Sequence, residues 1–299
     1  PGPGEVQIEH HAIGLNYIDV YHRTGLYPLD LPLTLGLEAA GEICALGEGV
    51  TDLHIGDRVA YASLPLGAYA EVRNLAADRV VKLPDGIASD QAAAMMLQGM
   101  TVEYLLQRAY PVQAGQTVLF HAAAGGVGLI FCQWAKHLGA TVIGTVGSED
   151  KAALARAHGC DHTIRYREED VVARVRELTG GRGVPVVFDG IGKATWEASL
   201  DCLAPRGMMV SFGNASGKVP PVELGALTSR GSLYLTRPTL MTYTADSTEM
   251  RASAQAVFAH VLAGTVRIAI NQHFALADAA EAHRALEARE TTGSTILLP

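Results

Sequence analysis

The chain has 299 residues, of which 48% are hydrophobic and 18% are charged, and its formal net charge is −8 at pH 7. This composition is typical of a globular enzyme of one or two domains and excludes a disordered or fibrous protein. The acidic balance disfavours a nucleic-acid partner, and no apolar run is long enough to span a membrane. With no secretory leader visible either, we expect a cytoplasmic protein.

The start of the chain and its cysteines bear on completeness and on metal binding. The first residues, Pro-Gly-Pro-Gly, precede a predicted strand at 6–13 without a Met, so we expect that an upstream segment belongs to this protein. Cys44, Cys132, Cys160 and Cys202 form no C-x-x-C pair. Neither a zinc lobe nor a disulfide framework is therefore expected, and cytosolic thiols are the preferred interpretation.

Short β-like runs separated by turns fill the first hundred residues, at 6–13, 40–46 and 58–61. Their spacing predicts a compact, mostly antiparallel β domain. Apolar residues then recur along 90–108, which predicts one helix.

From about residue 115 short apolar runs alternate with helical patterns. The predicted strands are 117–120, 141–146, 162–164, 186–188 and 208–212, and the predicted helices are 127–138, 150–158, 169–178 and 196–203. This alternation predicts βαβ units and a parallel sheet. After Pro238, helices at 246–262 and 278–288 and a strand at 294–298 are predicted to return to the first domain. We therefore expect an α/β fold, with a doubly wound parallel sheet inserted into a β-rich domain.

The strongest functional signal is the run Ala-Ala-Ala-Gly-Gly-Val-Gly at residues 122–128, between a predicted strand and a predicted helix. Small residues let the backbone approach a pyrophosphate, and the free N–H groups at the helix start bind the anion. We predict pyrophosphate contacts by Ala124, Gly125, Gly126, Val127 and Gly128, with Gly128 also letting the helix approach the sheet. The alternative is a turn that only connects strand to helix.

The end of the second strand of this domain bears on the choice between NADPH and NADH. A site selective for NADH places a carboxylate there, whereas this chain has Gly147 and Ser148. Lys151 follows one helical turn later, and Arg165 and Tyr166 end the next strand. A small polar tip with a nearby cation favours the 2′-phosphate of NADPH. The pair Glu149-Asp150 argues against it, unless both only stabilise a helix N-terminus.

Motifs spread over nearly the whole chain resemble the zeta-crystallin-like quinone oxidoreductases, a zinc-free group of the medium-chain dehydrogenase/reductase superfamily. They are residues 16–21, 25–28, 36–41, 56–59, 122–128, 189–192, 210–214 and 293–294. The resemblance implies a Rossmann-type domain at 102–238 inserted in a GroES-like catalytic domain formed by 1–101 and 239–299. It also implies NADPH-dependent reduction of quinones.

Zinc-dependent members of that superfamily carry a Cys near the position of Asn16 and a Gly-His-Glu where this chain has Gly36-Leu37-Glu38. Tetrahedral zinc needs thiolate or imidazole ligands at such points, so we predict no catalytic metal. Three nearby histidines, His10, His11 and His22, show no ligand spacing and are interpreted as surface residues. Without a Lewis acid, a quinone or an enone is a better acceptor than an alcohol or simple carbonyl, because its own π system spreads the developing charge.

The resemblance also implies roles for single residues. Asn16 would line the nicotinamide site and bond an acceptor oxygen, Tyr21 and Tyr27 would shape the acceptor pocket and assist protonation, and Asp19 would order this loop. The cofactor would further contact Thr101, Ser148, Lys151, Tyr166, Phe212, Asn214, Arg237 and Arg289. Taken alone, the tyrosines would be packing aromatics, Arg289 a helix-end cation and Asn16 a turn residue.

Two further expectations follow from the resemblance, and two competing functions stay open. Relatives carry roughly two dozen residues before the position of Pro1. The run 231–236 matches an edge strand that pairs with its copy in a homodimer, the alternative being an edge strand covered by a helix. The competing functions are an NADPH-dependent enone or alkenal reductase, which shares the zinc-free site, and a non-catalytic nucleotide- or RNA-binding crystallin-like protein.

Overall fold

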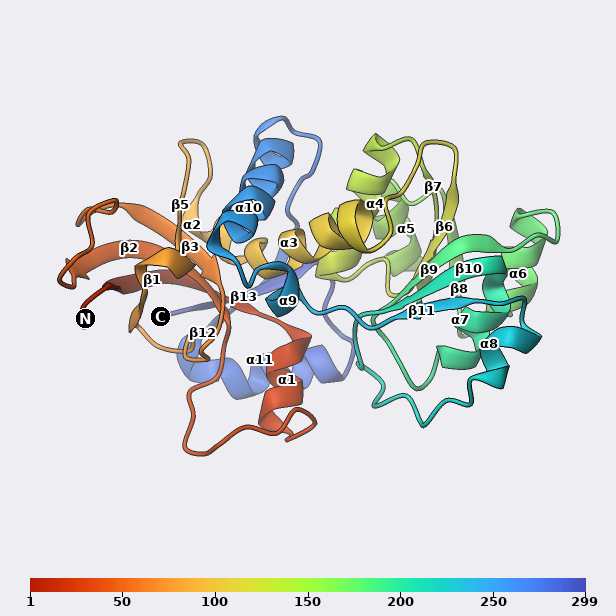
Figure 1. Ribbon diagram of the computed structural model, residues 1–299, viewed down its shortest axis with the longest axis horizontal. Coiled ribbons are helices and arrows are strands. Elements are labelled where there is room, and N and C mark those ends of the chain that lie inside the picture. The colour runs from red at the N-terminus through yellow and green to blue at the C-terminus, as the bar shows by residue number, and fades with distance from the viewer. The chain divides into compact units, whose positions relative to one another are not determined.

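The computed structural model describes all 299 residues and divides the chain into two compact units. Unit 1 consists of Pro1–Thr101, Tyr243–Gly264 and Ile268–Pro299, and unit 2 consists of Val102–Thr242 and Thr265–Arg267 (Figure 1). None of the helices combines the length and the apolar character that crossing a membrane requires.

Unit 1 is built on a seven-stranded sheet with the order β12-β13-β1-β2-β3-β5, in which β4 pairs with β1. The neighbouring strands are antiparallel except for the parallel pair β12 and β13. The strands are β1 (Glu5–Leu15), β2 (Glu38–Leu46), β3 (Arg58–Ala62), β4 (Val72–Ala76), β5 (Val81–Lys82), β12 (Ile270–Ala275) and β13 (Ser294–Leu298).

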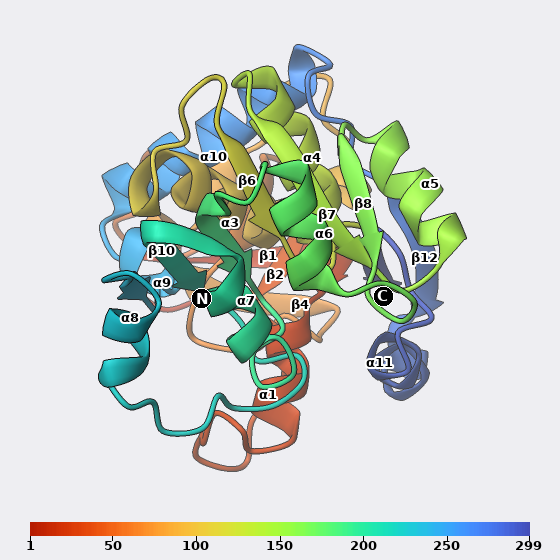
Figure 2. The ribbon, with the colours of Figure 1, turned by 90° about the vertical axis from the view of Figure 1, so that its right-hand side faces the viewer.

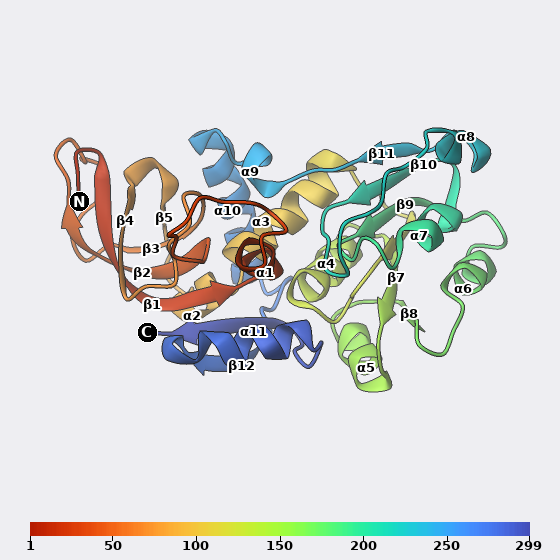
Figure 3. The ribbon, with the colours of Figure 1, turned by 90° about the horizontal axis from the view of Figure 1, so that it is seen from below.

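The core of unit 1 lies on one face of this sheet. Val6 and Ile8 of β1 point inward with the two-residue period of a strand, and Ile43 and Tyr61 of the next strands join them. The last part of the chain pairs with the first, because β13 runs beside β1, and Figure 3 shows β12 and α11 (Ala279–Glu287) on the same side of the unit.

The remaining regular elements of unit 1 are mostly short. They are α1 (Tyr17–Arg23), η1 (Ala77–Arg79), α2 (Ser89–Ala93), α3 (Met96–Tyr104), α10 (Ser247–Leu262) and η3 (Leu276–Asp278). Helix α3 continues into unit 2 after Thr101, and α9 (Leu240–Tyr243) belongs to unit 2 except for Tyr243. The prediction of a loop around Asp19 was wrong, because α1 begins there. Asn16 is its N-cap, and its backbone N–H donates to the Asp19 carboxylate at 2.9 Å.

The prediction of a single helix over 90–108 was also wrong, because two side chains take over helical hydrogen bonds. The N–H of Leu97 donates to the Glu38 carboxylate at 2.7 Å, and the carbonyl of Ala94 accepts from the Ser294 hydroxyl at 3.0 Å. The chain therefore breaks between α2 and α3. After α3 it continues as a π-helix at Leu105–Ala109.

Unit 2 is a six-stranded parallel sheet with the order β11-β10-β9-β6-β7-β8. Its strands are β6 (Thr117–Phe120), β7 (Thr141–Val146), β8 (His162–Arg165), β9 (Val184–Asp189), β10 (Leu203–Ser211) and β11 (Tyr234–Thr236). Its helices are α4 (Gly126–His137), α5 (Glu149–Ala157), α6 (Val171–Leu178), α7 (Trp196–Cys202) and α8 (Gly225–Ser229). The predicted doubly wound α/β fold is confirmed.

Helices cover both faces of the sheet of unit 2. The pair α4 and α5 packs on one face and the pair α6 and α7 on the other (Figure 2). The central strands β6, β7 and β9 are accordingly buried along almost their whole length, as in β7 with five of six residues buried. Phe120, Phe131 and Phe188 stack at the centre, with ring centroids 4.3 and 4.9 Å apart in successive pairs. The turns at the carboxyl ends of the strands are thereby held on a rigid base.

Candidate functional site

In unit 2, the turn between β6 and α4 is held by the neighbouring strand. Ala122 has a φ of 59°, and the N–H of Ala123 donates to the carbonyl of Thr145 at 3.0 Å. Gly125 is the N-cap of α4 and has no side chain to fill the space in front of the helix. The first N–H groups of a helix have no partner within it, so this end of α4 offers bare amides to an anion.

Gly128 allows the closest approach in this turn. A Cβ atom there would lie 2.5 Å from the carbonyl oxygen of Ala122 and 2.6 Å from that of Ala123. That Gly128 lets the helix approach the sheet stays a prediction, because the nearest atoms to this position belong to the turn that follows β6. Its missing side chain lets α4 approach the turn itself.

A buried polar chain that the sequence analysis missed fixes this turn. Ser199 Oγ donates to Asp189 Oδ2 at 2.7 Å, so it accepts from His121 Nε2 at 3.0 Å. The other ring nitrogen of His121 then accepts from Thr145 Oγ1 at 3.0 Å, and Thr145 Oγ1 accepts from the N–H of Ala122 at 3.3 Å. Burial lowers the pKa of His121, in agreement with a neutral ring. This series of hydrogen bonds connects the turn between β6 and α4 to the carboxyl end of β9.

Asp189 also orders the loop that follows it. Its Oδ1 accepts from the N–H groups of Ile191 and Gly192 at 2.7 and 3.0 Å. Phe212 lies against this loop, since a Cβ at Gly190 would meet its ring at 3.0 Å. Asn214 lies beside Gly192, whose Cβ would be 3.3 Å from Asn214 Oδ1. The structure thus places Phe212 and Asn214 at the carboxyl ends of parallel strands, where ligands bind in such sheets.

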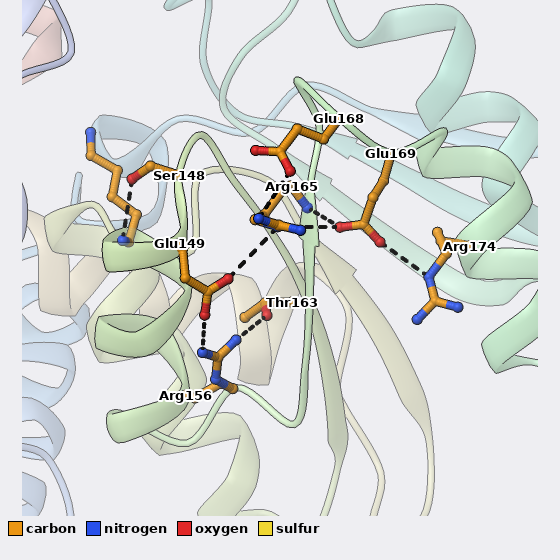
Figure 4. Close-up of polar contacts among 9 residues, drawn as sticks. Ser148, Glu149, Arg156, Thr163, Arg165, Glu168, Glu169 and Arg174 are labelled. Atoms are coloured by element: carbon orange, nitrogen blue, oxygen red, sulfur yellow. Dashed lines mark hydrogen bonds and ion pairs between the residues drawn. The ribbon is translucent and has the colours of Figure 1, made fainter.

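The end of β7 gathers the residues predicted to surround the adenosine phosphate. Ser148 is the N-cap of α5, and its hydroxyl accepts from the N–H of Lys151 at 3.4 Å. A Cβ at Gly147 would lie 2.9 Å from the hydroxyl of Tyr166. Glu149, which argued against a phosphate here, forms ion pairs with Arg156 and Arg165 (Figure 4).

In unit 1, Asn16 is 6% exposed and lies in a buried hydrogen-bonded network. Its Nδ2 donates to Glu38 Oε2 at 2.6 Å, and its Oδ1 accepts from Gln98 Nε2 at 3.3 Å. Gln98 Oε1 in turn lies 2.8 Å from Ser294 Oγ. An amide nitrogen has two hydrogens, so one N–H of Asn16 remains to meet an acceptor. The contributions of Glu38, Gln98 and Ser294 were not predicted.

A second polar network lies at the start of α1, the helix that Asn16 caps. Asp19 is fully buried, and its Oδ2 accepts from the hydroxyl of Tyr69 at 3.1 Å as well as from the N–H of Asn16. The Tyr69 hydroxyl also lies 2.9 Å from His283 Nε2. Burial raises the pKa of Asp19 to about 7, against the effect of its two donors. Asp19 was predicted to order a loop, and in the structure its carboxylate accepts from the N–H of Asn16 at the start of α1.

The tyrosines predicted for the acceptor pocket lie together on and after α1. The rings of Tyr21 and Tyr27 are 5.1 Å apart, edge to face, and Tyr17 lies 5.5 Å from Tyr21. Arg289 follows α11 with a φ of 62° and is close enough to Tyr17 to affect its pKa, which desolvation raises overall. Edge-to-face pairs of this kind stabilise packing, so both roles of the tyrosines are compatible with this geometry.

The last two predicted cofactor residues are Thr101 and Arg237. Thr101 is buried in α3 as the last residue of the first segment of unit 1. Arg237 follows β11 in unit 2 and donates to the carbonyl of Pro238 at 3.1 Å. A cavity of about 830 Å³ in unit 1, lined in part by Lys82, Arg251 and Phe258, includes none of the predicted site residues.

The sequence matches two family models. Residues 2–85 match the alcohol dehydrogenase GroES-like domain, and residues 126–258 match the zinc-binding dehydrogenase family. A curated quinone oxidoreductase from Pseudomonas aeruginosa is 58% identical over 100% of this chain and 92% of its own length, and a 2-haloacrylate reductase from Burkholderia sp. is 46% identical over 100% and 92%. A crystal structure of Escherichia coli quinone oxidoreductase complexed with NADPH superposes with a TM-score of 0.98 at 50% identity, covering 100% of this chain and 93% of that one.

The chain belongs to the quinone oxidoreductase family of the medium-chain dehydrogenase/reductase superfamily. The zinc in the description of the second family model has no evident ligand set in this member. No group of three or more His, Cys, Asp or Glu side chains is placed to hold a metal ion. The interpretation of His10 as a surface residue was wrong. It is 4% exposed and lies 2.6 Å from the carbonyl of Ala70 and 2.9 Å from the hydroxyl of Tyr61.

In this quinone oxidoreductase family member, burial raises the pKa of Glu38 to about 8 from an ordinary value of 4.5, despite donation by Asn16 and Leu97. The folded chain therefore binds the Glu38 proton more tightly than the unfolded chain does. The resulting stability is complete below about pH 4.5 and is lost as the pH rises through about 8.

We expect Glu38→Gln to remove this pH dependence. The variant converts an acceptor into a donor and should melt below wild type at low pH. The deficit should shrink by at least about 2 °C between about pH 5 and about pH 8, since 1 kcal/mol shifts Tm by roughly 2–4 °C in domains of this size. Calorimetry of both proteins across this range checks it, with Glu42→Gln, at an exposed residue of the same strand, as the control. A deficit that is constant with pH would contradict a raised Glu38 pKa.

Proposed function

We propose that this protein reduces quinones with NADPH and that it does so without a bound metal. The observation that carries the proposal is the glycine-rich turn at residues 122–128, combined with an end of β7 that has Gly147 and Ser148 in place of a carboxylate. The relatives named quinone oxidoreductase, and the one complexed with NADPH, support it.

The residues of unit 2 fit the two ends of this cofactor. The amides of Gly125, Gly126, Val127 and Gly128, with Ala124 before them, would hold the pyrophosphate, because they lie at the N-terminus of α4. Ser148, Lys151 and Tyr166 would surround the 2′-phosphate, while Phe212 and Asn214 would line the continuation of the site. When bound, the nicotinamide supplies the hydride for the reduction. Thr101, Arg237 and Arg289 remain proposed contacts.

The residues of unit 1 would act on the acceptor. We infer that the remaining N–H of Asn16 donates to one acceptor oxygen, since both other polar positions of the amide are already bonded. Tyr21 and Tyr27 would form the wall against the flat ring, and a hydroxyl of this pair would supply the proton. A quinone suits such a site because its π system spreads the added charge and needs no Lewis acid.

Steady-state oxidation of NADPH and of NADH with a panel of quinones and enones tests the proposal. We expect turnover with quinones and a clear preference for NADPH. Electron paramagnetic resonance would reveal a semiquinone if the reduction proceeds by single electrons. Equal efficiency with NADH, or no oxidation of either nucleotide, would contradict the proposal.

Reduction of a conjugated carbon–carbon double bond is the second candidate, because the 46%-identical relative is named a 2-haloacrylate reductase. It would use the same cofactor turn and the same metal-free network around Asn16. The ratio of quinone to enone turnover in the same assay decides between the two. We further propose a cytoplasmic location, which the four free cysteines support.

We also propose a homodimer in which the edge strand β11 pairs with a second copy. β11 ends the sheet of unit 2, and Tyr234 and Leu235 on it are 59% and 43% exposed, contrary to an edge covered by a helix. We expect Leu235→Lys to shift the protein from dimer to monomer in sedimentation, with Leu262→Lys, at a leucine of unit 1 that is 51% exposed, as the control. A wild-type monomer, or an unchanged dimer in Leu235→Lys, would contradict this interface.

A further inference from the structure

Six charged side chains form a network at the carboxyl end of β8, which we name the Arg165 cluster. They are Glu149, Arg156, Arg165, Glu168, Glu169 and Arg174 (Figure 4). The cluster holds three acidic and three basic groups and adjoins Ser148, the residue proposed to meet the 2′-phosphate. Its arrangement therefore sets the charge that a phosphate in this position would experience.

Glu149 is the member of the cluster whose negative charge would oppose phosphate binding at Ser148. It is the first residue of α5, directly after Ser148, and its side chain is 60% exposed. A carboxylate that turned toward Ser148 would repel a 2′-phosphate and would suit the 2′-hydroxyl of NADH instead.

The carboxylate of Glu149 is held by two arginines. Its Oε1 lies 2.6 Å from Arg156 Nη2, and its Oε2 lies 3.7 Å from Arg165 Nε. Both arginines lower the pKa of Glu149, Arg156 more strongly, so it stays charged. Figure 4 shows this carboxylate turned toward the two guanidinium groups and away from Ser148.

Each of the two arginines also has a partner other than Glu149 (Figure 4). Arg156 Nη1 donates to Thr163 Oγ1 at 2.9 Å, and Arg165 Nη1 lies 2.9 Å from Glu168 Oε2. The backbone N–H of Arg165 also donates to Glu169 Oε1 at 2.8 Å. An arginine fixed by several partners loses less freedom on pairing with Glu149 than a free side chain would.

We propose that Arg156 and Arg165 determine cofactor specificity by holding the Glu149 carboxylate away from the 2′-phosphate. The inference rests on the proposed use of NADPH and explains how a chain with an acidic residue at this helix start can accept that cofactor. Neither arginine needs to contact the cofactor. Because these pairs are exposed, the expected effect is modest, roughly three- to tenfold in affinity.

Binding of two small probes to the full chain isolates the effect. Adenosine 2′,5′-bisphosphate carries the 2′-phosphate and 5′-AMP lacks it, so the ratio of their Kd values from calorimetry reports on this subsite alone. In wild type we expect the bisphosphate to bind more tightly than 5′-AMP. If it does not, the proposed use of NADPH fails, whatever the arginines do.

The test is a cycle of variants. Arg156→Gln/Arg165→Gln should weaken bisphosphate binding roughly three- to tenfold and leave 5′-AMP binding unchanged, and adding Glu149→Gln should restore it. Arg174→Gln, which removes a cluster cation that does not pair with Glu149, is the matched control and should match wild type. Far-ultraviolet circular dichroism checks that each variant folds, and if the double variant does not, Arg156→Gln and Arg165→Gln are compared singly.

Three results would overturn the proposal. An unchanged bisphosphate Kd in the arginine variants would show that Glu149 needs no restraint. A loss that Glu149→Gln does not restore would assign the arginines to direct phosphate contacts. Equal weakening of both probes would assign them to the structure of the turn.

Discussion

Gly128→Val is expected to weaken NADPH binding by at least about 100-fold, equivalent to about 2.8 kcal/mol. Any Cβ at this position meets the carbonyl oxygens of Ala122 and Ala123 at 2.5 and 2.6 Å, and these are backbone atoms that cannot rotate away. The turn must therefore open, and the amides at the start of α4 lose their common direction. Fluorescence titration with NADPH measures the change.

The control for this variant is Gly225→Val. Gly225 begins α8 in the same unit, and a Cβ there would have no neighbour within 4 Å. It should bind NADPH like wild type. If Gly128→Val folds, as judged by circular dichroism, and also binds like wild type, the turn is a plain connection and not the cofactor site.

Asn16→Ala is expected to lower kcat by roughly 10- to 100-fold while changing the Kd for NADPH much less. Removing the amide takes away the N–H proposed to stabilise charge on the acceptor oxygen, and this charge develops only as the reaction proceeds. Glu38 also loses its 2.6 Å donor, so Ser294→Ala is the matched control, because it loosens the same network at Gln98 without touching the acceptor. Steady-state kinetics with one quinone and a separate NADPH titration give the two quantities.

Tyr27→Ala should likewise slow turnover more than it weakens NADPH binding, and Tyr27→Phe separates the two roles of this residue. The phenylalanine ring keeps the 5.1 Å contact with Tyr21 and lacks only the hydroxyl. A reduced kcat in Tyr27→Phe would show that the hydroxyl takes part in proton transfer. An unchanged kcat in Tyr27→Phe would show that the ring only shapes the acceptor pocket. An unchanged kcat in both Asn16→Ala and Tyr27→Ala would remove these residues from the chemistry.

The fold of unit 2 could be predicted from local patterns in the sequence. Strands β6 and β7 begin and end where apolar runs and glycine turns predicted, because a parallel strand buried on both faces leaves a continuous apolar run. The turn at residues 122–128 could also be predicted from local sequence, because its small residues lie close together along the chain. The predicted family is confirmed by the comparisons.

Polar contacts between residues far apart in the sequence could not be predicted from these local patterns. Glu38 meets Asn16 and Leu97 across 22 and 59 residues, and the hydroxyl of Ser294 reaches Ala94 across 200. These contacts interrupt the helix predicted over 90–108, although nothing in that segment itself signals a break. His10 was misjudged for the same reason, because its partners Tyr61 and Ala70 lie on other strands and loops.

Elements of marginal local signal were also missed. Helix α1 is only seven residues long, and its start depends on the Asp19 carboxylate accepting the N–H of Asn16. Strand β12 has side chains that are half-buried or exposed, so it lacks the apolar run by which the other strands were found. Both elements are stabilised by their tertiary contacts more than by their own sequences.

The most direct test of metal-free reduction is the rate of NADPH oxidation with a quinone after exhaustive dialysis against a chelator, with the zinc content of the same sample measured by elemental analysis. We expect an undiminished rate at substoichiometric zinc, because the proposed site has an amide network around Asn16 and no group of metal-ligating side chains. A rate that falls with the zinc content and returns when zinc is added would contradict this.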